Sequence, residues 1–535
     1  MAGPGYGETA LGSRTDGGMR VAGVAPDGAS TEPRVTPSQR WVLVSTSLAM
    51  GLAFLDETAV VTALPAIQRE FEATSSEVQW VVAAYLLALA SLMSAAGRLA
   101  DIFGRKRLFV IGAVVFGIGS AACAAAPDEL FLAVSRALQG IGGSLLIPLA
   151  MANATAIFPA ERRGWAIGII STVATVFLAL GPLIGGSLVE LASWRWIFLV
   201  NLPVIAAIVI LAIRWMPETR GAGSTHFDGY GLVLLVSGLV CIALALLNAQ
   251  DWGAGSPTTL AVLAAGIALL IGFVMVEKRA REPLIDLRLL RIPAVVGSLV
   301  ALFAFQFSIM GLTVYLTLYL QLALGYSPAA AGALTLPTVM MAPFLSSYVG
   351  RLSDRIGTRL LTPGATLLAA ISVGAIGLLC HVGNVWLLMP AFLLFGIARP
   401  IGTIAGSVGT VAAIPPEHRA LASSLATQSR QLGAVLGVAL LGLVLSTVES
   451  RRRDELLAGV DAGFGHRARG VLDGILSGSQ TSNEVLNSLA PSAQAAARGA
   501  ATTAYIAGFS AAMYVTAGLT FVAAVVSAAL LNRRS

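Results

Sequence analysis

Apolar runs long enough to cross a membrane follow one another along almost the whole chain, from Trp41 to Leu531. A helix needs about 20 apolar residues to cross roughly 30 Å of hydrocarbon. Inside a bilayer the backbone must satisfy its own hydrogen bonds, which such uncharged runs achieve as helices. Because 56% of the residues are hydrophobic and only 12% are charged, the composition excludes an ordinary soluble protein. We therefore expect an all-α integral membrane protein.

The apolar runs divide into fourteen expected spans. They are residues 41–64, 78–97, 108–126, 129–157, 164–190, 196–216, 229–248, 258–276, 294–320, 329–349, 360–380, 386–411, 418–447 and 503–531. Residues 1–40 are rich in Gly, Pro, Ser and Thr and show no apolar period, so we expect a disordered cytoplasmic tail. This stretch lacks the apolar core and cleavage site of a signal peptide.

The distribution of Arg and Lys among the loops orients the chain in the membrane. The loops on one side, together with the C-terminal end, carry nearly all of these charges, whereas the short loops on the other side hold only Arg69 and Arg195. Short cytoplasmic loops are enriched in positive charge. We therefore expect both termini in the cytoplasm. The long outer loop 448–502 starts with basic residues, but long loops follow this rule poorly.

One loop signature occurs twice, each time between two apolar runs. Residues 97–105 read Gly-Arg-Leu-Ala-Asp-Ile-Phe-Gly-Arg, and residues 350–357 repeat the spacing of Gly, Leu, Asp and Gly. The first copy joins the second and third spans, and the second copy joins the tenth and eleventh. Repeated halves are typical of secondary transporters. The spacing predicts two six-helix bundles, 41–216 and 294–531, separated by two additional helices within 229–276.

Several short motifs occur in these spans and in the loop between the second and third spans. They are Leu55-Asp56-Glu57-Thr58-Ala59-Val60, the loop from Gly97 to Arg107, Arg136-Ala137-Leu138-Gln139-Gly140, Gly181-Pro182-Leu183-Ile184-Gly185-Gly186, the stretch from Trp194 to Pro203, and Arg430-Gln431-Leu432-Gly433. Together they resemble the major facilitator superfamily and, within it, the fourteen-helix drug:proton antiporters. The resemblance implies a 6+2+6 fold and an export function. Phe177, Thr62 and Glu57 depart from the family pattern, so the resemblance leaves the substrate range open.

Two charged residues lie inside the first and fourth spans. At 1.5 Å per residue, Asp56 and Arg136 fall at the same depth, in the outer half of the membrane. Each would cost about 2.5–3.5 kcal/mol at the bilayer centre if it faced lipid alone, so we expect a facing pair or a shared wet cavity. Our hypothesis is that Asp56 binds the proton and that Arg136, when near, makes it release the proton. The alternative is a static ion pair that joins the two helices.

Candidate substrate-binding residues are Glu57, Arg399 and Gln306. Glu57 is turned about 100° around its helix from Asp56, so the two cannot face the same spot. One of them could attract lipophilic cations while the other titrates, or Glu57 could point to a polar seam near the outer rim. Arg399 could bind an anionic substrate group or a carboxylate of the other half, or serve only packing. Arg430, nearer the cytoplasm, is expected to be structural.

Two sets of residues are expected to serve the conformational change. A cytoplasmic latch that favours the outward-open state is predicted at Gly97, Asp101, Gly104, Arg105, Asp354 and Arg355. The alternative is that the positive charges of these loops only set the topology. Close helix packing is predicted at Gly140, Gly181, Pro182, Gly185 and Gly186.

Several other activities are excluded or disfavoured. Neither lysine of the chain, Lys106 or Lys278, is followed by Ser or Thr, so a phosphate-binding P-loop is impossible and an ion gradient must drive transport. Four histidines and three cysteines show no ligand spacing, so we expect no metal or cofactor. The histidines form no reactive motif of a membrane enzyme such as an acyltransferase.

The sequence therefore predicts a multi-pass transporter of the bacterial cytoplasmic membrane. We expect a monomer in the lipid bilayer that exchanges protons for lipophilic, cationic or amphipathic drugs and binds no nucleic acid. The alternative is a dedicated exporter of one metabolite, such as a self-made antibiotic or a lipid.

Overall fold

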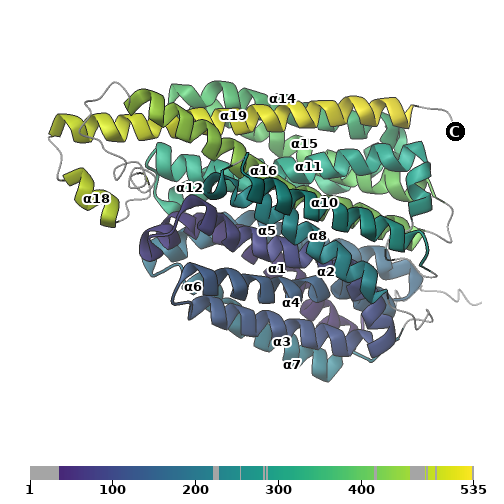
Figure 1. The fold of residues 1–535 in the computed structure, drawn as a ribbon. Coiled ribbons are helices and arrows are strands. Elements are labelled where there is room, and N and C mark those ends of the chain that lie inside the picture. The colour runs from purple at the N-terminus through teal and green to yellow at the C-terminus, as the bar shows by residue number, and fades with distance from the viewer. Residues whose placement is uncertain are drawn as a thin grey trace, which may run out of the picture.

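The computed structural model of the chain describes residues 35–220, 228–253, 255–280, 284, 287–414, 419–457, 476, 480–487 and 491–532. Throughout these residues every regular element is a helix (Figure 1). Among them, 14 spans are long and apolar enough to cross a membrane, which confirms the predicted number. The predicted fold class is therefore correct, and the cytoplasmic position of the termini stays a prediction.

The first helices begin at side-chain caps. The Thr36 hydroxyl accepts a hydrogen bond from the backbone N–H of Gln39, whose side chain accepts one from the backbone of Thr36 in return. Thr74 and Glu77 form the same capping box, which satisfies backbone groups that a first helical turn leaves free. The helices of this half are α1 (Pro37–Phe71), α2 (Ser75–Phe103), α3 (Arg105–Ala124), α4 (Glu129–Ile157), α5 (Ala160–Leu191), α6 (Trp196–Leu199) and α7 (Asn201–Trp215).

The remaining helices form the middle and the second half of the chain. The middle contains α8 (Gly229–Leu247), α9 (Ala249–Trp252) and α10 (Pro257–Glu277). The second half contains η1 (Leu287–Arg291), α11 (Pro293–Leu318), η2 (Tyr319–Ala323), α12 (Pro328–Thr335), η3 (Leu336–Thr338), α13 (Met341–Ile356), α14 (Thr358–Leu379), η4 (Cys380–Val382), α15 (Val385–Ala412), α16 (Arg419–Leu457), α18 (Gln480–Asn487) and α19 (Pro491–Leu531).

Both copies of the repeated loop contain a glycine at the end of a helix, and the two glycines have similar backbone conformations. Gly104 has φ 101° and ψ 137°, and Gly357 has φ 86° and ψ 149°. Because a Cβ atom strains a positive φ, glycine suits both positions. Gly104 joins α2 to α3, and Gly357 joins α13 to α14. The sequence repeat is therefore also a structural repeat. We call the face that carries these two glycines the loop face, and the opposite one the far face.

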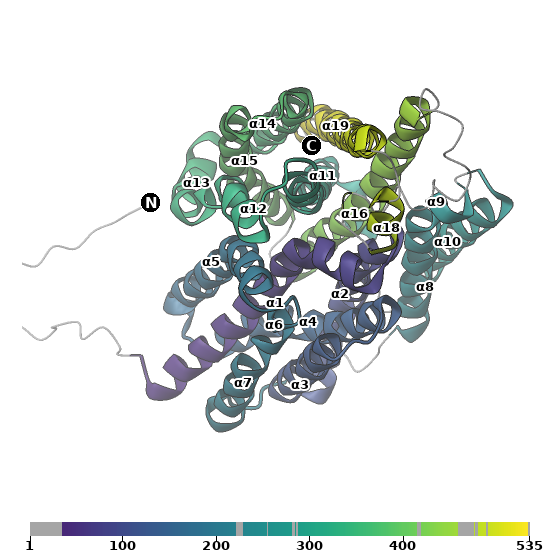
Figure 2. The same ribbon diagram turned by 90° about the vertical axis from the view of Figure 1, so that its left-hand side faces the viewer.

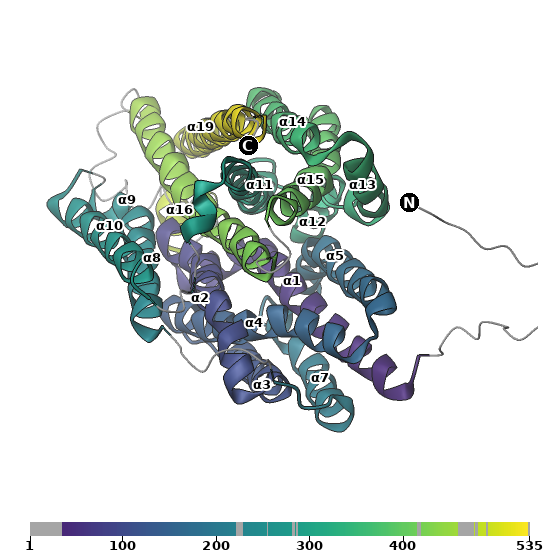
Figure 3. The same cartoon turned by 90° about the vertical axis from the view of Figure 1, so that its right-hand side faces the viewer.

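Viewed along the helices, the spans form two groups with a helix pair at their flank (Figure 2 and Figure 3). In the first group α1 packs on α5, and α4 packs on α2 and α3. In the second group α11 packs on α16, and α14 packs on α15 and α19. α8 packs on α10 and also contacts α2 and α16. This arrangement agrees with the predicted order of six, two and six spans.

The two groups meet closely through α5 and α12 at the far face. A Cβ atom added to Gly186 would overlap the backbone carbonyl of Pro328. Likewise, a Cβ atom added to Gly332 would overlap the carbonyl of Pro182. Small residues allow two helix backbones to approach in this way. The far face is therefore closed at this contact.

Two predicted boundaries differ from the structure. α1 begins at Pro37, within the predicted tail, because Thr36 caps it; residues 1–34 lie outside the described residues. α16 continues to Leu457 and α19 begins at Pro491, so helix extends into both ends of the predicted outer loop 448–502. The segment from 491 is rich in alanine, the strongest helix former. Within the predicted outer loop, residues 458–475, 477–479 and 488–490 lie outside the described residues.

Candidate functional site

Asp56 of α1 and Arg136 of α4 form an ion pair in the interior of the first half. Nη1 of Arg136 lies 2.5 Å from Oδ2 of Asp56, and both side chains are 0% exposed. Nε of Arg136 donates to the carbonyl of Val81 at 3.0 Å. The guanidinium carbon also lies 4.3 Å from the centre of the Tyr85 ring. Such a cation–π contact adds to the stabilisation of a desolvated guanidinium.

Neutral donors complete the surroundings of Asp56. Its Oδ1 accepts hydrogen bonds from the side-chain amides of Gln139 at 2.8 Å and Asn201 at 2.9 Å. Both amides also donate to the hydroxyl of Ser120, at 2.9 Å and 3.3 Å. Gln139 in addition accepts from Arg136. The fully buried Asp56 carboxylate thus contacts three donors from two other helices, α4 and α7.

Glu57, the next residue of α1, faces a different environment. It lines a cavity between the two halves, although its own exposed fraction is only 3%. Among the described residues, no hydrogen bond or ion pair joins its carboxylate to another side chain. Because consecutive helix residues point about 100° apart, one carboxylate enters the sealed network and the other the cavity. Glu57 therefore lines the cavity and does not lie in a polar seam near the outer rim, which was the alternative expectation.

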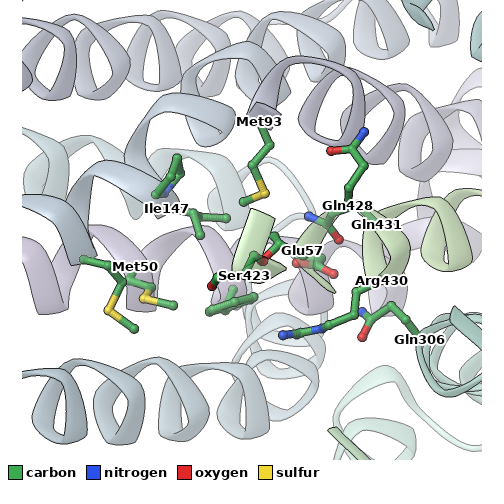
Figure 4. Close-up of a pocket in the computed structure, with 13 residues that line it drawn as sticks. Met50, Glu57, Met93, Ile147, Gln306, Ser423, Gln428, Arg430 and Gln431 are labelled. Atoms are coloured by element: carbon green, nitrogen blue, oxygen red, sulfur yellow. The ribbon is translucent and has the colours of Figure 1, made fainter. Parts of the chain in front are cut away.

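The cavity consists of two adjoining lobes of about 370 Å³ and about 470 Å³. Both lobes are lined by Met50, Phe54, Glu57, Met151, Gln306 and Arg430. Figure 4 shows Glu57, Arg430 and Gln306 gathered on one side of the pocket and Met50 on the other. Arg399 lines the larger lobe and is 9% exposed. The structure thus brings together all three predicted substrate-binding residues.

The cavity extends toward the loop face. Ser423, near the beginning of α16, lines the smaller lobe and is exposed. Val408, near the end of α15, lines the larger lobe and is 40% exposed. Both of these helix ends lie at the loop face. Since the two halves meet closely at the far face, the structure describes a state that is open on the loop side.

Comparison with known proteins identifies the family. The sequence model described as Major Facilitator Superfamily matches residues 46–438. The chain belongs to the Major Facilitator Superfamily. It is 36% identical to the puromycin resistance protein of Streptomyces alboniger, over 76% of this chain and 82% of that protein. It is 33% identical to a multidrug resistance protein of Mycobacterium tuberculosis, over 76% of each chain.

A solved structure agrees with this family assignment at the level of the fold. The inward-facing, occupied crystal structure of a bacterial homologue of the human lysosomal transporter Spinster matches with a TM-score of 0.62. The match covers 92% of this chain and 97% of that chain, at 18% identity. As a Major Facilitator Superfamily member, the chain is a multi-pass membrane transporter of small molecules and not an enzyme.

In this Major Facilitator Superfamily protein the first loop copy is tied to its own half. Arg105 pairs with Asp101 one turn earlier, at 3.1 Å, and its backbone N–H donates to the carbonyl of Thr219 at 2.9 Å. The backbone N–H of Lys106 donates to the carboxylate of Glu218 at 3.1 Å. Glu218 also packs against Gly104, where it leaves no room for a Cβ atom. The sequence reasoning did not anticipate this role of Glu218.

The other predicted latch residues make less specific contacts. No atom lies within 4 Å of a Cβ atom added to Gly97. Arg355 is exposed. The side chain of Asp354 lies outside the described residues. The latch between the two halves therefore stays a prediction, and in this conformation the loop around Asp101 bonds within the first half.

The predicted packing residues lie at close helix contacts. A Cβ atom on Gly140 would overlap the backbone of Tyr85, and one on Gly185 would overlap the backbone of Ala59. Gly181 stands in the same way against the hydroxyl of Thr58. These contacts hold α4 against α2 and α5 against α1, within one half. Gly186 and Pro182 instead take part in the contact between the halves.

Phe177 replaces the glycine with which the family motif on α5 begins, and the neighbouring helix compensates. A Cβ atom on Gly51 of α1 would lie 3.0 Å from the ring of Phe177. Gly51 thus leaves room for the Phe177 ring. The departure from the family pattern is therefore accommodated without opening the α1–α5 contact.

Three residues that contact Asp56 or line the cavity were not predicted as site residues from the sequence. Gln139 and Asn201 stand inside motifs that carried the family resemblance, but no role was assigned to them. Gln139 and Asn201 could have been noticed because each is a polar residue within an apolar run, and such a side chain needs a polar partner inside the membrane. Arg430 was expected to be structural, whereas it lines both lobes of the cavity. The sequence gives the depth of Arg430 along α16, but this depth does not determine in which direction the side chain points.

Proposed function

We propose that this transporter exports lipophilic, cationic or amphipathic drugs in exchange for protons, by alternating access across the bacterial cytoplasmic membrane. The proposal rests on the two neighbouring carboxylates of α1. Asp56 is sealed in an ion pair with Arg136, whereas Glu57 lines an open cavity. In this proposal Asp56 carries the coupling proton and Glu57 meets the substrate. In this proposal the loop face and both termini are cytoplasmic, and the protein acts as a monomer.

Proton transfer to Asp56 would remove the negative charge that Arg136 contacts. A buried pair that loses one partner is destabilised by about 3–5 kcal/mol, because the remaining charge is uncompensated. Protonation would therefore favour a conformation in which Arg136 finds other acceptors or water. One charge crossing 100 mV releases about 2.3 kcal/mol, and the pH difference adds to this driving force; for a monovalent cation exchanged against one proton, only the pH difference contributes.

The conformational change would be a rocking of the bundles 41–216 and 294–531 against each other, with the helices within 229–276 as an inserted pair. The close contact of Gly186 with Pro328 would open at the far face. The loops that carry Asp101 and Arg355 would then latch the loop face. Alternating access by such rocking is common to transporters built of repeated halves.

A dedicated exporter of one metabolite is the second candidate. The relative from Streptomyces alboniger is named for resistance to a single antibiotic, puromycin, which favours this reading. The relative from Mycobacterium tuberculosis is named for multidrug resistance, which favours the first. A panel of unrelated drugs, tested in a host that lacks its own efflux pumps, separates the two. Resistance to one compound alone would support the dedicated exporter.

The central experiment uses the purified protein in proteoliposomes that contain a pH-sensitive dye. With a drug on one side and a proton gradient across the membrane, we expect drug movement in one direction and proton movement in the other. Collapse of the gradient with a protonophore should stop net drug transport. Drug accumulation that continues unchanged without any proton gradient would contradict the proposed coupling.

The Glu57→Gln variant is expected to bind a lipophilic cation such as ethidium about tenfold more weakly. A glutamine keeps the shape of the side chain but removes the only negative charge among the described cavity-lining residues. A charged contact contributes about 1.5–3 kcal/mol. The KM for ethidium in the proteoliposome assay measures this effect. Glu190→Gln, which removes an exposed carboxylate of α5, is the control. An unchanged KM in Glu57→Gln would remove Glu57 from the substrate site.

A further inference from the structure

The charges that line the central cavity do not balance. Among the lining residues of both lobes, the charged ones are Glu57, Arg399 and Arg430. With Glu57 ionised these three residues carry a net charge of +1, and with Glu57 protonated a net charge of +2. Arg136 does not add to this sum, because Asp56 neutralises it at 2.5 Å. The cavity is therefore positive in either protonation state of its one carboxylate.

The two cavity arginines lack the partners that Arg136 has. No hydrogen bond or ion pair of the Arg399 guanidinium occurs among the described residues, although the side chain is 9% exposed. The Nε of Arg430 is buried and has no acceptor in the part of the chain that the structure describes. Guanidinium groups removed from water are normally paired or hydrogen-bonded. A buried donor without an acceptor in a folded protein calls for an explanation, and a ligand is one.

The rest of the lining suits an apolar body. Met50, Phe54, Met93 and Met151 form much of the wall of the smaller lobe. Methionine side chains are flexible and polarisable, so they adapt to different apolar shapes. In Figure 4 the labelled methionines Met50 and Met93 stand apart from Arg430. The cavity thus offers an apolar wall and a basic end.

We propose that the cavity binds amphiphiles that carry an acidic group, a carboxylate, phenolate or sulfonate, placed between Arg399 and Arg430. This inference rests on the proposed export function and narrows its substrate class. Glu57 lies on the same side of the pocket as Arg430, where it accepts either a proton or an amine of a zwitterionic substrate. Guanidinium groups bind such oxyanions through paired N–H donors, which lysine does not reproduce.

The sign of the substrate charge has a consequence for energetics. Exchange of one proton for one monovalent cation moves no net charge across the membrane. Exchange of one inward proton for one outward monoanion moves the equivalent of two positive charges inward. A membrane potential that is negative inside therefore drives export of an acidic amphiphile even without a pH difference. Dependence on the potential thus separates the two substrate classes.

The test compares two fluorescent probes with the purified full-length protein in nanodiscs of uncharged lipid. Anilinonaphthalene sulfonate is the acidic amphiphile and ethidium is the cationic one. We expect the wild type to bind the sulfonate more tightly than ethidium. Arg399→Gln and Arg430→Gln should each weaken sulfonate binding about tenfold or more, by loss of a charged hydrogen bond. Neither substitution should weaken ethidium binding.

Control variants separate a local role from a general loss of charge or fold. Arg291→Gln removes an exposed arginine of η1, outside the cavity, and should leave both affinities unchanged. Arg399→Lys keeps the charge but not the paired donors, and should recover sulfonate affinity only in part. Thermal melting of each variant reports folding. If one glutamine variant does not fold, Arg399→Lys and the other glutamine variant decide the question.

The outcomes distinguish this inference from the proposed function. Sulfonate binding that is weaker than ethidium binding, or unaffected by both glutamine variants, would overturn the inference. In proteoliposomes, proton-coupled export of ethidium without export of the sulfonate would overturn it as well, and leave the export function intact. Binding of the sulfonate by Arg399 and Arg430 with no transport of any probe would instead contradict the proposed function.

Discussion

The Asp56→Asn variant is expected to lose proton-coupled export completely while it still reaches the membrane. Asparagine keeps the size of the side chain but carries no negative charge, so it cannot exchange a proton. In the structure this carboxylate contacts Arg136 at 2.5 Å and accepts from Gln139 and Asn201. Resistance of an efflux-deficient host measures export, and membrane abundance shows that the protein is present. Resistance at the wild-type level would contradict the assignment.

A double variant distinguishes coupling from structure. Asp56→Asn alone leaves the Arg136 guanidinium uncompensated, which costs about 3–5 kcal/mol in a buried pair. Arg136→Gln alone leaves the carboxylate uncompensated in the same way. The combination Asp56→Asn with Arg136→Gln removes both charges and should recover thermal stability. If the pair only joined α1 to α4, this double variant would also recover export, whereas we expect it to remain inactive.

The Gly186→Ala variant is expected to disfavour the state that is closed at the far face. The added Cβ atom would overlap the backbone carbonyl of Pro328, so α5 and α12 must separate. Overpacking of this kind costs about 1–3 kcal/mol. Because 1.4 kcal/mol is a factor of ten, the ratio of far-face-closed to far-face-open molecules should fall about tenfold. Export should fall with it, since the transport cycle needs both states.

Thiol labelling measures this shift. A cysteine placed by Ser423→Cys lies in the cavity near the loop face, where a maleimide reaches it in the present conformation. Cys123 and Cys380 are buried, and Cys241→Ser removes the partly exposed thiol. We expect slower labelling when Gly186→Ala is added. Gly168→Ala, on the same helix with open space at its Cβ position, is the matched control. Equal labelling rates in the two alanine variants would contradict the closing role of Gly186.

The membrane spans could be read from the sequence because their causes are local. Each span is a run of apolar residues that satisfies its backbone within one helix, so the count of fourteen needs no knowledge of the neighbours. The equal depths of Asp56 and Arg136 followed in the same way from the rise per residue along a helix. The matching conformations of Gly104 and Gly357 likewise reflect a repeated local signature.

The partners of the intramembrane charges could not be read in this way. Depth along a helix does not state in which direction a side chain points, and rotation of a span is set by packing against its neighbours. The position of Arg430 near one end of the thirteenth span is compatible with lipid, packing or a cavity, so the sequence did not place it at the cavity that it lines. The sealing of Asp56 by Asn201 of α7 depends on how two separate helices meet Ser120 of α3.

The sequence by itself determined the number of spans, the repeat of the two halves and the presence of buried charges, because hydropathy and helical rise act within one segment. Only the tertiary structure decided that Asp56 is sealed and Glu57 open, and that Arg399 and Arg430 face the same cavity as Glu57. These relations join residues from different helices, and their geometry depends on the contact of small residues such as Gly186 with a neighbouring backbone. Packing between helices therefore brings charged residues from different helices together at one site.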